Sequence, residues 1–165
     1  MNGSSKILIL GGIALAAFGM LYGLHYALFV EHQTLERMGN ALADAFVRVA
    51  QGRVADAQAS IDAYGLTRYN YVRQVDVHSH WIGLAMLLIV LGVVFERVGF
   101  SESVRRWLAL ALVTGSVVFP LGVILQTATH SGVLTSALAV GGSALVTFSL
   151  AAVALGFTRH GGNRA

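Results

Sequence analysis

The sequence predicts an all-α protein: a four-helix transmembrane bundle with an extracytoplasmic helical hairpin between its first and second helices. Three observations support this fold class. The 165 residues are 56% hydrophobic and only 12% charged, about half the charge of an ordinary soluble domain. The apolar residues gather in four long runs. The one long polar segment repeats its apolar residues at helical spacing. At this length we expect a single four-span domain, residues 1–165.

Each apolar run is long enough to cross a bilayer as a helix. The runs are 7–30, 77–95, 107–126 and 133–157. About 20 residues at 1.5 Å each cross a hydrocarbon core of about 30 Å, and within lipid a helix satisfies the backbone hydrogen bonds of its own segment. Pro120 predicts a kink in the third run, because proline removes one helical hydrogen bond. We therefore expect four spans surrounded by membrane lipids.

The basic residues are distributed unequally across these spans. With four spans, both termini share one side with the connection between the second and third spans. The basic residues of that side are Lys6, Arg97, Arg105, Arg106, Arg159 and Arg164, and its acidic residues are Glu96 and Glu102. The positive-inside rule predicts the inner (cytoplasmic) membrane with both termini in the cytoplasm. The same asymmetry explains the net charge of +3 without a nucleic-acid partner.

The segment 31–76 falls on the extracytoplasmic side and carries five arginines and six acidic residues. Its first half contains one apolar stripe: Leu35, Met38, Leu42, Ala45, Phe46 and Val49. Gln51-Gly52 predicts a break, and a second short helix should end near Gly65. We interpret the segment as a hairpin that either packs on the end of the bundle through this stripe or lies flat at the membrane interface.

Five of the six histidines fall on the same extracytoplasmic side. They are His25, His32, His78, His80 and His130, whereas His160 lies in the cytoplasmic tail. Ionisable residues at membrane depth are costly, and histidine is a common ligand of metals and haem iron. Each histidine alone is also compatible with a simple interfacial hydrogen-bond donor. Together they favour a metal or haem site.

The spacing of the histidines ranks them as ligands. His78 and His80 are two residues apart, which places them on nearly opposite faces of a helix. His25 and His32 are seven residues apart and share a face, about 10 Å apart along the axis. We predict His78 as the ligand of haem iron, with His25 or His130 as further cofactor-binding candidates. His32 and His80 are the alternative iron ligands.

Haem fits the composition better than zinc. The absence of cysteine excludes disulfides, thiolate catalysis, cysteine-ligated iron–sulfur clusters and covalently attached c-type haem. Zinc needs three or four close ligands, whereas noncovalent haem b needs an apolar slot and one or two histidines. Glu31 and Asp76 lie near the same boundary, so zinc or copper stays an alternative.

From Val77-His78-Ser79-His80-Trp81 onward, the sequence resembles the styrene oxide isomerase family, small four-span bacterial membrane proteins that carry b-type haem. The resemblance runs from about Asp76 to Val123. It includes the His78-Ser79 pair opening one span, the Gly99-Phe100 pair after it and Arg106 opening the next.

The resemblance implies that His78 is the axial haem ligand and that ferric iron acts as a Lewis acid toward an epoxide oxygen. The family also uses an asparagine six residues later and a tyrosine late in the following span. Here those positions are Leu84 and about Val123, so neither residue type is present. The resemblance therefore implies a haem-binding relative whose activity differs, and no catalytic residue is assigned.

Three functions stay open. The first is a haem protein with one open coordination site for Lewis-acid or small-ligand chemistry. The second is a bis-histidine electron-transfer cytochrome b subunit, and the third is an accessory subunit of a larger membrane complex without a cofactor. Small residues in the fourth run predict close helix contacts in a homo-oligomer or complex: Ser136, Gly141, Ser143, Ala144 and Gly156.

Overall fold

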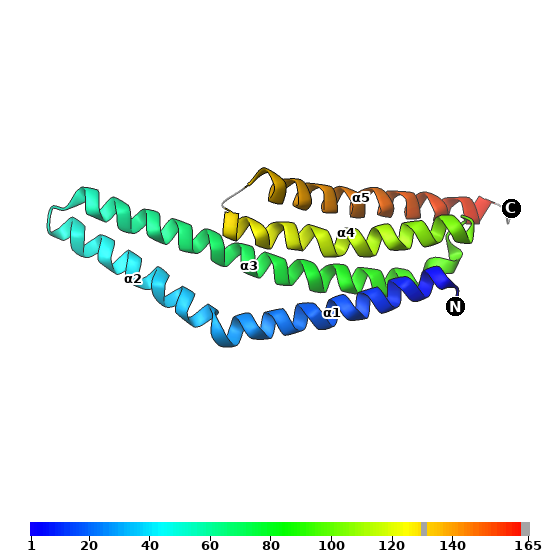
Figure 1. The fold of residues 1–165 in the computed structure, drawn as a ribbon, viewed down its shortest axis with the longest axis horizontal. Coiled ribbons are helices and arrows are strands. Elements are labelled where there is room, and N and C mark those ends of the chain that lie inside the picture. Colours follow the sequence, from blue (N-terminus) through cyan, green and yellow to red (C-terminus); the bar gives the residue numbers. More distant parts are fainter. Residues whose placement is uncertain (130–131, 163–165) are drawn as a thin grey trace. The chain divides into compact units, whose positions relative to one another are not determined.

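The computed structural model describes residues 1–129 and 132–162, and within them the protein is helical with no strand (Figure 1). The helices are α1 (Gly3–Phe29), α2 (Glu31–Ala50), α3 (Val54–Val94), η1 (Phe95–Arg97), α4 (Glu102–Thr129) and α5 (Val133–Gly162). The chain divides into two compact units, one of Met1–Met20 with Val77–Ala165 and one of Leu21–Asp76. The predicted all-α class is confirmed.

Four helices are long and apolar enough to cross a membrane. These stretches are Gly3–Phe29, Val54–Arg97, Glu102–Thr127 and Val133–Arg159. Three of them contain a whole apolar run and the first covers its run up to Phe29, and each starts or ends in polar flanks because helical hydrogen bonding continues beyond the apolar residues. The protein is therefore a multi-pass membrane protein by the length and composition of its helices.

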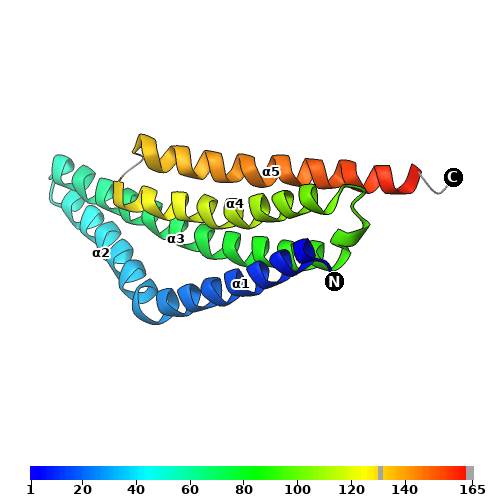
Figure 2. The same cartoon turned by 45° about the vertical axis from the view of Figure 1, so that its right-hand side comes forward.

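Figure 2 shows α4 and α5 side by side in the unit of Met1–Met20 and Val77–Ala165, and glycines set the spacing of the helices in this unit. A methyl group added at Gly12 of α1 would come within 2.8 Å of the carbonyl oxygen of Ala85 in α3. One added at Gly115 of α4 would come within 2.9 Å of the carbonyl oxygen of Gly142 in α5. Small residues allow such close approach, which strengthens van der Waals packing between helices in lipid. Trp81, Leu88 and Leu112 are among the fully buried side chains of this unit.

The amino end of α1 is capped by a carboxylate from α4. Glu102 accepts a hydrogen bond from the backbone N–H of Ser4 at 3.0 Å and one from its hydroxyl at 3.2 Å. Arg105 forms an ion pair with the same carboxylate at 3.0 Å. A helix amino end has unpaired N–H groups and a partial positive charge, so an acceptor there is stabilising. This contact joins α1 to α4 within one unit.

In the unit Leu21–Asp76, α2 is followed by a turn. The predicted break at Gln51-Gly52 is confirmed, and Gly52 has a φ of 74°, which favours glycine. The expected helix end near Gly65 is wrong, because α3 continues without interruption from Val54 to Val94. One interior glycine costs a helix only about 1 kcal/mol, and the good helix formers around it offset that cost.

Small residues form the seam between α2 and the first part of α3, and Ala45 is the member of the predicted apolar stripe that is buried in it. Thr34, Ala45 and Ala57 are buried, while Phe46 is 75% exposed and Val49 58% exposed. The Tyr71 hydroxyl donates to Glu31 at 3.3 Å, and Arg48 lies 3.8 Å from Asp56. These contacts pair the beginning of α2 with a late part of the segment and its end with an early part, so the two helices are antiparallel. The larger members of the stripe are exposed within this unit, and their docking on the bundle or at the membrane interface stays a prediction.

Candidate functional site

His78 lies on α3 and its ring reaches the backbone of α1. The Nδ1 atom is 2.9 Å from the carbonyl oxygen of Gly19, and the side chain is partly buried. A carbonyl oxygen can only accept a hydrogen bond, so Nδ1 carries the proton. The lone pair of the neutral ring is then on Nε2, which points away from Gly19 because the two ring nitrogens diverge.

Gly19 makes this contact possible because it has no side chain. A methyl group at Gly19 would lie 3.1 Å from Cβ of Trp81 and 3.1 Å from Cδ1 of Ile82. Both distances are shorter than ordinary van der Waals contact, so the neighbouring side chains or α1 would have to shift by a few tenths of an ångström. The glycine therefore keeps its own carbonyl oxygen within reach of His78. The sequence gives little signal for this pairing, because glycine is frequent in membrane helices.

His80 faces a different neighbour. Its ring lies 4.7 Å from that of Phe119 in α4, and the side chain is exposed. His78 and His80 thus contact different helices, α1 and α4, in agreement with their spacing of two residues. They do not form one two-histidine site.

The other candidate histidines do not join His78 within its unit. His25 and His32 belong to the unit Leu21–Asp76 and are exposed, with the His25 ring 5.4 Å from that of Phe29. His130 lies outside the described residues. Across residues 1–129 and 132–162, no three His, Asp or Glu side chains gather closely enough to hold a metal ion. The zinc or copper alternative with Glu31 and Asp76 therefore has no assembled ligand set in that part of the chain.

A cavity of about 300 Å³ lies among α1, α3 and α4. Its lining is Gly11, Ala14, Leu15, Phe18, Trp81, Val113, Val117 and Leu121. Phe18 and Trp81 meet edge to face, with ring centroids 4.8 Å apart. No histidine lines the cavity, so it is separate from the His78 contact. Sequence reasoning missed it, and the small residues Gly11 and Ala14 opposite an aromatic pair were its only signal.

A comparison with protein-family models, curated proteins and solved structures finds no match to this chain. The resemblance to the styrene oxide isomerase family therefore stays a prediction based on the residues around His78.

The tautomer of His78 is the one that an axial haem ligand needs, although the cavity described above does not reach this side chain. Haem brings four nitrogen ligands of its own, so the protein needs to supply only one or two imidazoles. Metal-bound histidines commonly donate their other ring N–H to a backbone carbonyl, which fixes the tautomer and raises the basicity of the ligating nitrogen. His78 has this arrangement toward Gly19, with Nε2 as the available nitrogen.

Proposed function

We propose that this chain is an integral membrane protein that binds b-type haem with Nε2 of His78 as axial ligand. The observation that carries the proposal is the hydrogen bond from Nδ1 of His78 to the Gly19 carbonyl oxygen at 2.9 Å. It holds the ring in the tautomer that an iron ligand requires. The missing three-ligand cluster in the described residues favours haem over zinc, because haem needs fewer protein ligands.

We further propose that both termini lie in the cytoplasm and that the protein resides in the inner membrane. Helix α3 has 41 residues and is about 60 Å long, twice the thickness of a hydrocarbon core. Since its apolar part is the run 77–95, its first part and α2 lie outside the lipid. The charge asymmetry of the sequence puts them on the extracytoplasmic side.

Haem held by a single histidine supplies iron with an open coordination position for a small ligand or a Lewis-basic substrate oxygen. The chain's own contribution is to keep the proton on Nδ1 and orient the ring through Gly19. The isomerase resemblance favours Lewis-acid isomerase or small-ligand chemistry. Leu84 and Val123 are both apolar and cannot supply the polar groups that the family uses, so the substrate differs from an epoxide or is bound by other residues.

The visible spectrum of the purified protein tests this function. We expect a Soret band with a high-spin signature, lost or much weakened in His78→Ala. His80→Ala is the matched control, because this neighbouring histidine packs on Phe119 and should leave the spectrum unchanged. Haem retained at full occupancy in His78→Ala would refute the assignment.

The same spectra distinguish the alternatives. A low-spin spectrum that becomes high-spin in His25→Ala or His130→Ala would identify a second axial histidine and favour an electron-transfer cytochrome b subunit. A protein purified after growth with ample haem that shows no Soret band would favour an accessory subunit of a larger membrane complex.

A further inference from the structure

One face of the helix pair in the unit Leu21–Asp76 is both apolar and exposed. We call it the apolar face: Leu35, Phe46 and Val49 from α2, and Val54, Ile61 and Val72 from α3. Phe46 and Val54 keep 75% and 69% of their surface exposed, so they contact little within the unit.

The apolar residues of the two helices lie on the same side of the pair. In each helix they lie roughly a quarter turn around the axis from the buried seam. The direction of this quarter turn, viewed from the amino end of the helix, is the same in α2 and in α3. Because α2 and α3 are antiparallel, the same rotational sense brings both sets to one side. Exposed Arg37 and Asp44 lie on the other side of α2. The helix pair is therefore amphipathic as a whole.

Lipid does not reach most of this face. Val54 precedes Val77, the start of the apolar run, by 23 residues, which is about 35 Å of helix. Phe46 and Val49 are next to the turn that precedes Val54. This step rests on the proposed extracytoplasmic position of α2 and the first part of α3. In that position the apolar face meets water, and covering it with protein is favourable by about 25 cal/mol per Å².

We propose that the apolar face binds the same face of a second copy of this chain. Segment 31–76 has five arginines and six acidic residues, so its net charge is close to zero and identical copies do not repel each other strongly. Copies in one membrane share one orientation. The same face therefore lies at the same height on each copy, and copies can meet around an axis normal to the membrane.

Cysteine cross-linking in membranes tests this interface, because the native chain contains no cysteine. Phe46→Cys should give oxidative cross-links in high yield, since two copies of this position meet near the axis. Asp44→Cys, on the polar side of the same helix, is the control and should give little product. The cross-linked mass should be twice that of the 17.5 kDa chain.

A double variant tests whether the apolar contact drives association. Phe46→Gln with Val49→Gln should lower cross-linking at Ile61→Cys at least tenfold and shift the purified protein toward a single copy by light scattering. Val47→Gln is the matched control, because Val47 is also 54% exposed but lies off the apolar face. Far-UV circular dichroism should show the same helix content in the wild type, the Phe46→Gln/Val49→Gln variant and the Val47→Gln variant.

Three outcomes would overturn the proposal. One is a wild-type protein that purifies as a single copy and a Phe46→Cys variant that does not cross-link. Another is a cross-linked product whose mass is not a multiple of the chain mass, which would indicate a different partner protein. The third is strong quenching of a fluorophore at Phe46→Cys by quencher-labelled lipid tails, which would indicate lipid contact. Outside labelling of a cysteine at Gln51 tests the extracytoplasmic position separately.

Discussion

At the scale of single residues, the contact between His78 and Gly19 is the feature most open to test. Gly19→Ala adds a methyl group 3.1 Å from Cβ of Trp81 and from Cδ1 of Ile82, and the shift that relieves these contacts should weaken the hydrogen bond between His78 and Gly19. We expect lower haem occupancy, and a loss of about 1–3 kcal/mol in the free energy of unfolding from overpacking.

Gly83→Ala is the matched control for Gly19→Ala. Gly83 also lies in a membrane helix close to His78 in sequence, but a methyl group there has no atom within 4 Å. The substitution should leave the Soret band unchanged and raise stability by about 1 kcal/mol through helix propensity. Equal haem occupancy in both variants, measured by Soret absorbance per protein, would show that the Gly19 contact does not position His78.

At the scale of helices, α5 contains two adjacent glycines, Gly141 and Gly142, whose replacement should have opposite effects on stability. A methyl group at Gly142 would come within 2.7 Å of Cα of Phe119, whereas one at Gly141 would meet nothing within 4 Å. We expect Gly142→Ala to lower the free energy of unfolding by about 1–3 kcal/mol and Gly141→Ala to raise it slightly. Thermal unfolding in detergent measures both. Similar melting temperatures would contradict the close α4–α5 contact.

The helices also show which features the sequence can predict. The four apolar runs locate the membrane helices because lipid forces an apolar segment to satisfy its own hydrogen bonds. Gln51-Gly52 locates the turn because a positive φ favours glycine. Gly65 misled because its cost is local and small compared with a helix that continues on both sides.

Contacts between helices were harder to predict. The apolar stripe of α2 contains large side chains such as Phe46 and Val49, which are exposed within the unit. The seam with α3 buries Thr34 and the small stripe residue Ala45, because small residues allow a closer approach of two backbones. Likewise, the residue type and position of His78 predict a ligand, but they do not predict its hydrogen bond to the Gly19 carbonyl oxygen. That bond depends on how α1 and α3 pack, and no local sequence pattern encodes this packing.

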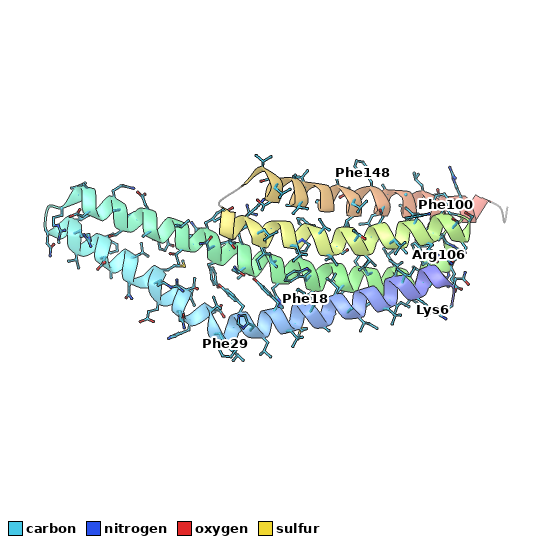
Figure 3. The ribbon with its side chains drawn as sticks, viewed as in Figure 1. Lys6, Phe18, Phe29, Phe100, Arg106 and Phe148 are labelled. Carbon is cyan, nitrogen blue, oxygen red and sulfur yellow. The ribbon has the colours of Figure 1, made fainter. Side chains whose placement is uncertain are left out.

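At the scale of the whole molecule, the charged residues at one end of the bundle lead to a prediction about orientation. Lys6 of α1 and Arg106 of α4 lie at the same end of the unit that contains them, as Figure 3 shows. The termini and the short α3–α4 connection carry six basic residues against two acidic ones. Short positively charged flanks stay in the cytoplasm during insertion.

A reporter and a cysteine test this orientation from opposite sides. A fluorescent or enzymatic reporter that works only in the cytoplasm, fused after Ala165, should be active. A single cysteine replacing Gln51 in the turn between α2 and α3 should react with a membrane-impermeant maleimide in intact cells, and the native chain gives no background because it has no cysteine.

Moving the positive charge to the other side of the membrane should reverse the orientation of the chain. Replacing Arg105 and Arg106 by Gln while adding lysines beside the turn should increase the fraction of chains labelled only after lysis, because the positive charge then favours retaining the turn in the cytoplasm. If Gln51→Cys in the otherwise native chain reacts only after lysis, the orientation is the reverse of the one proposed.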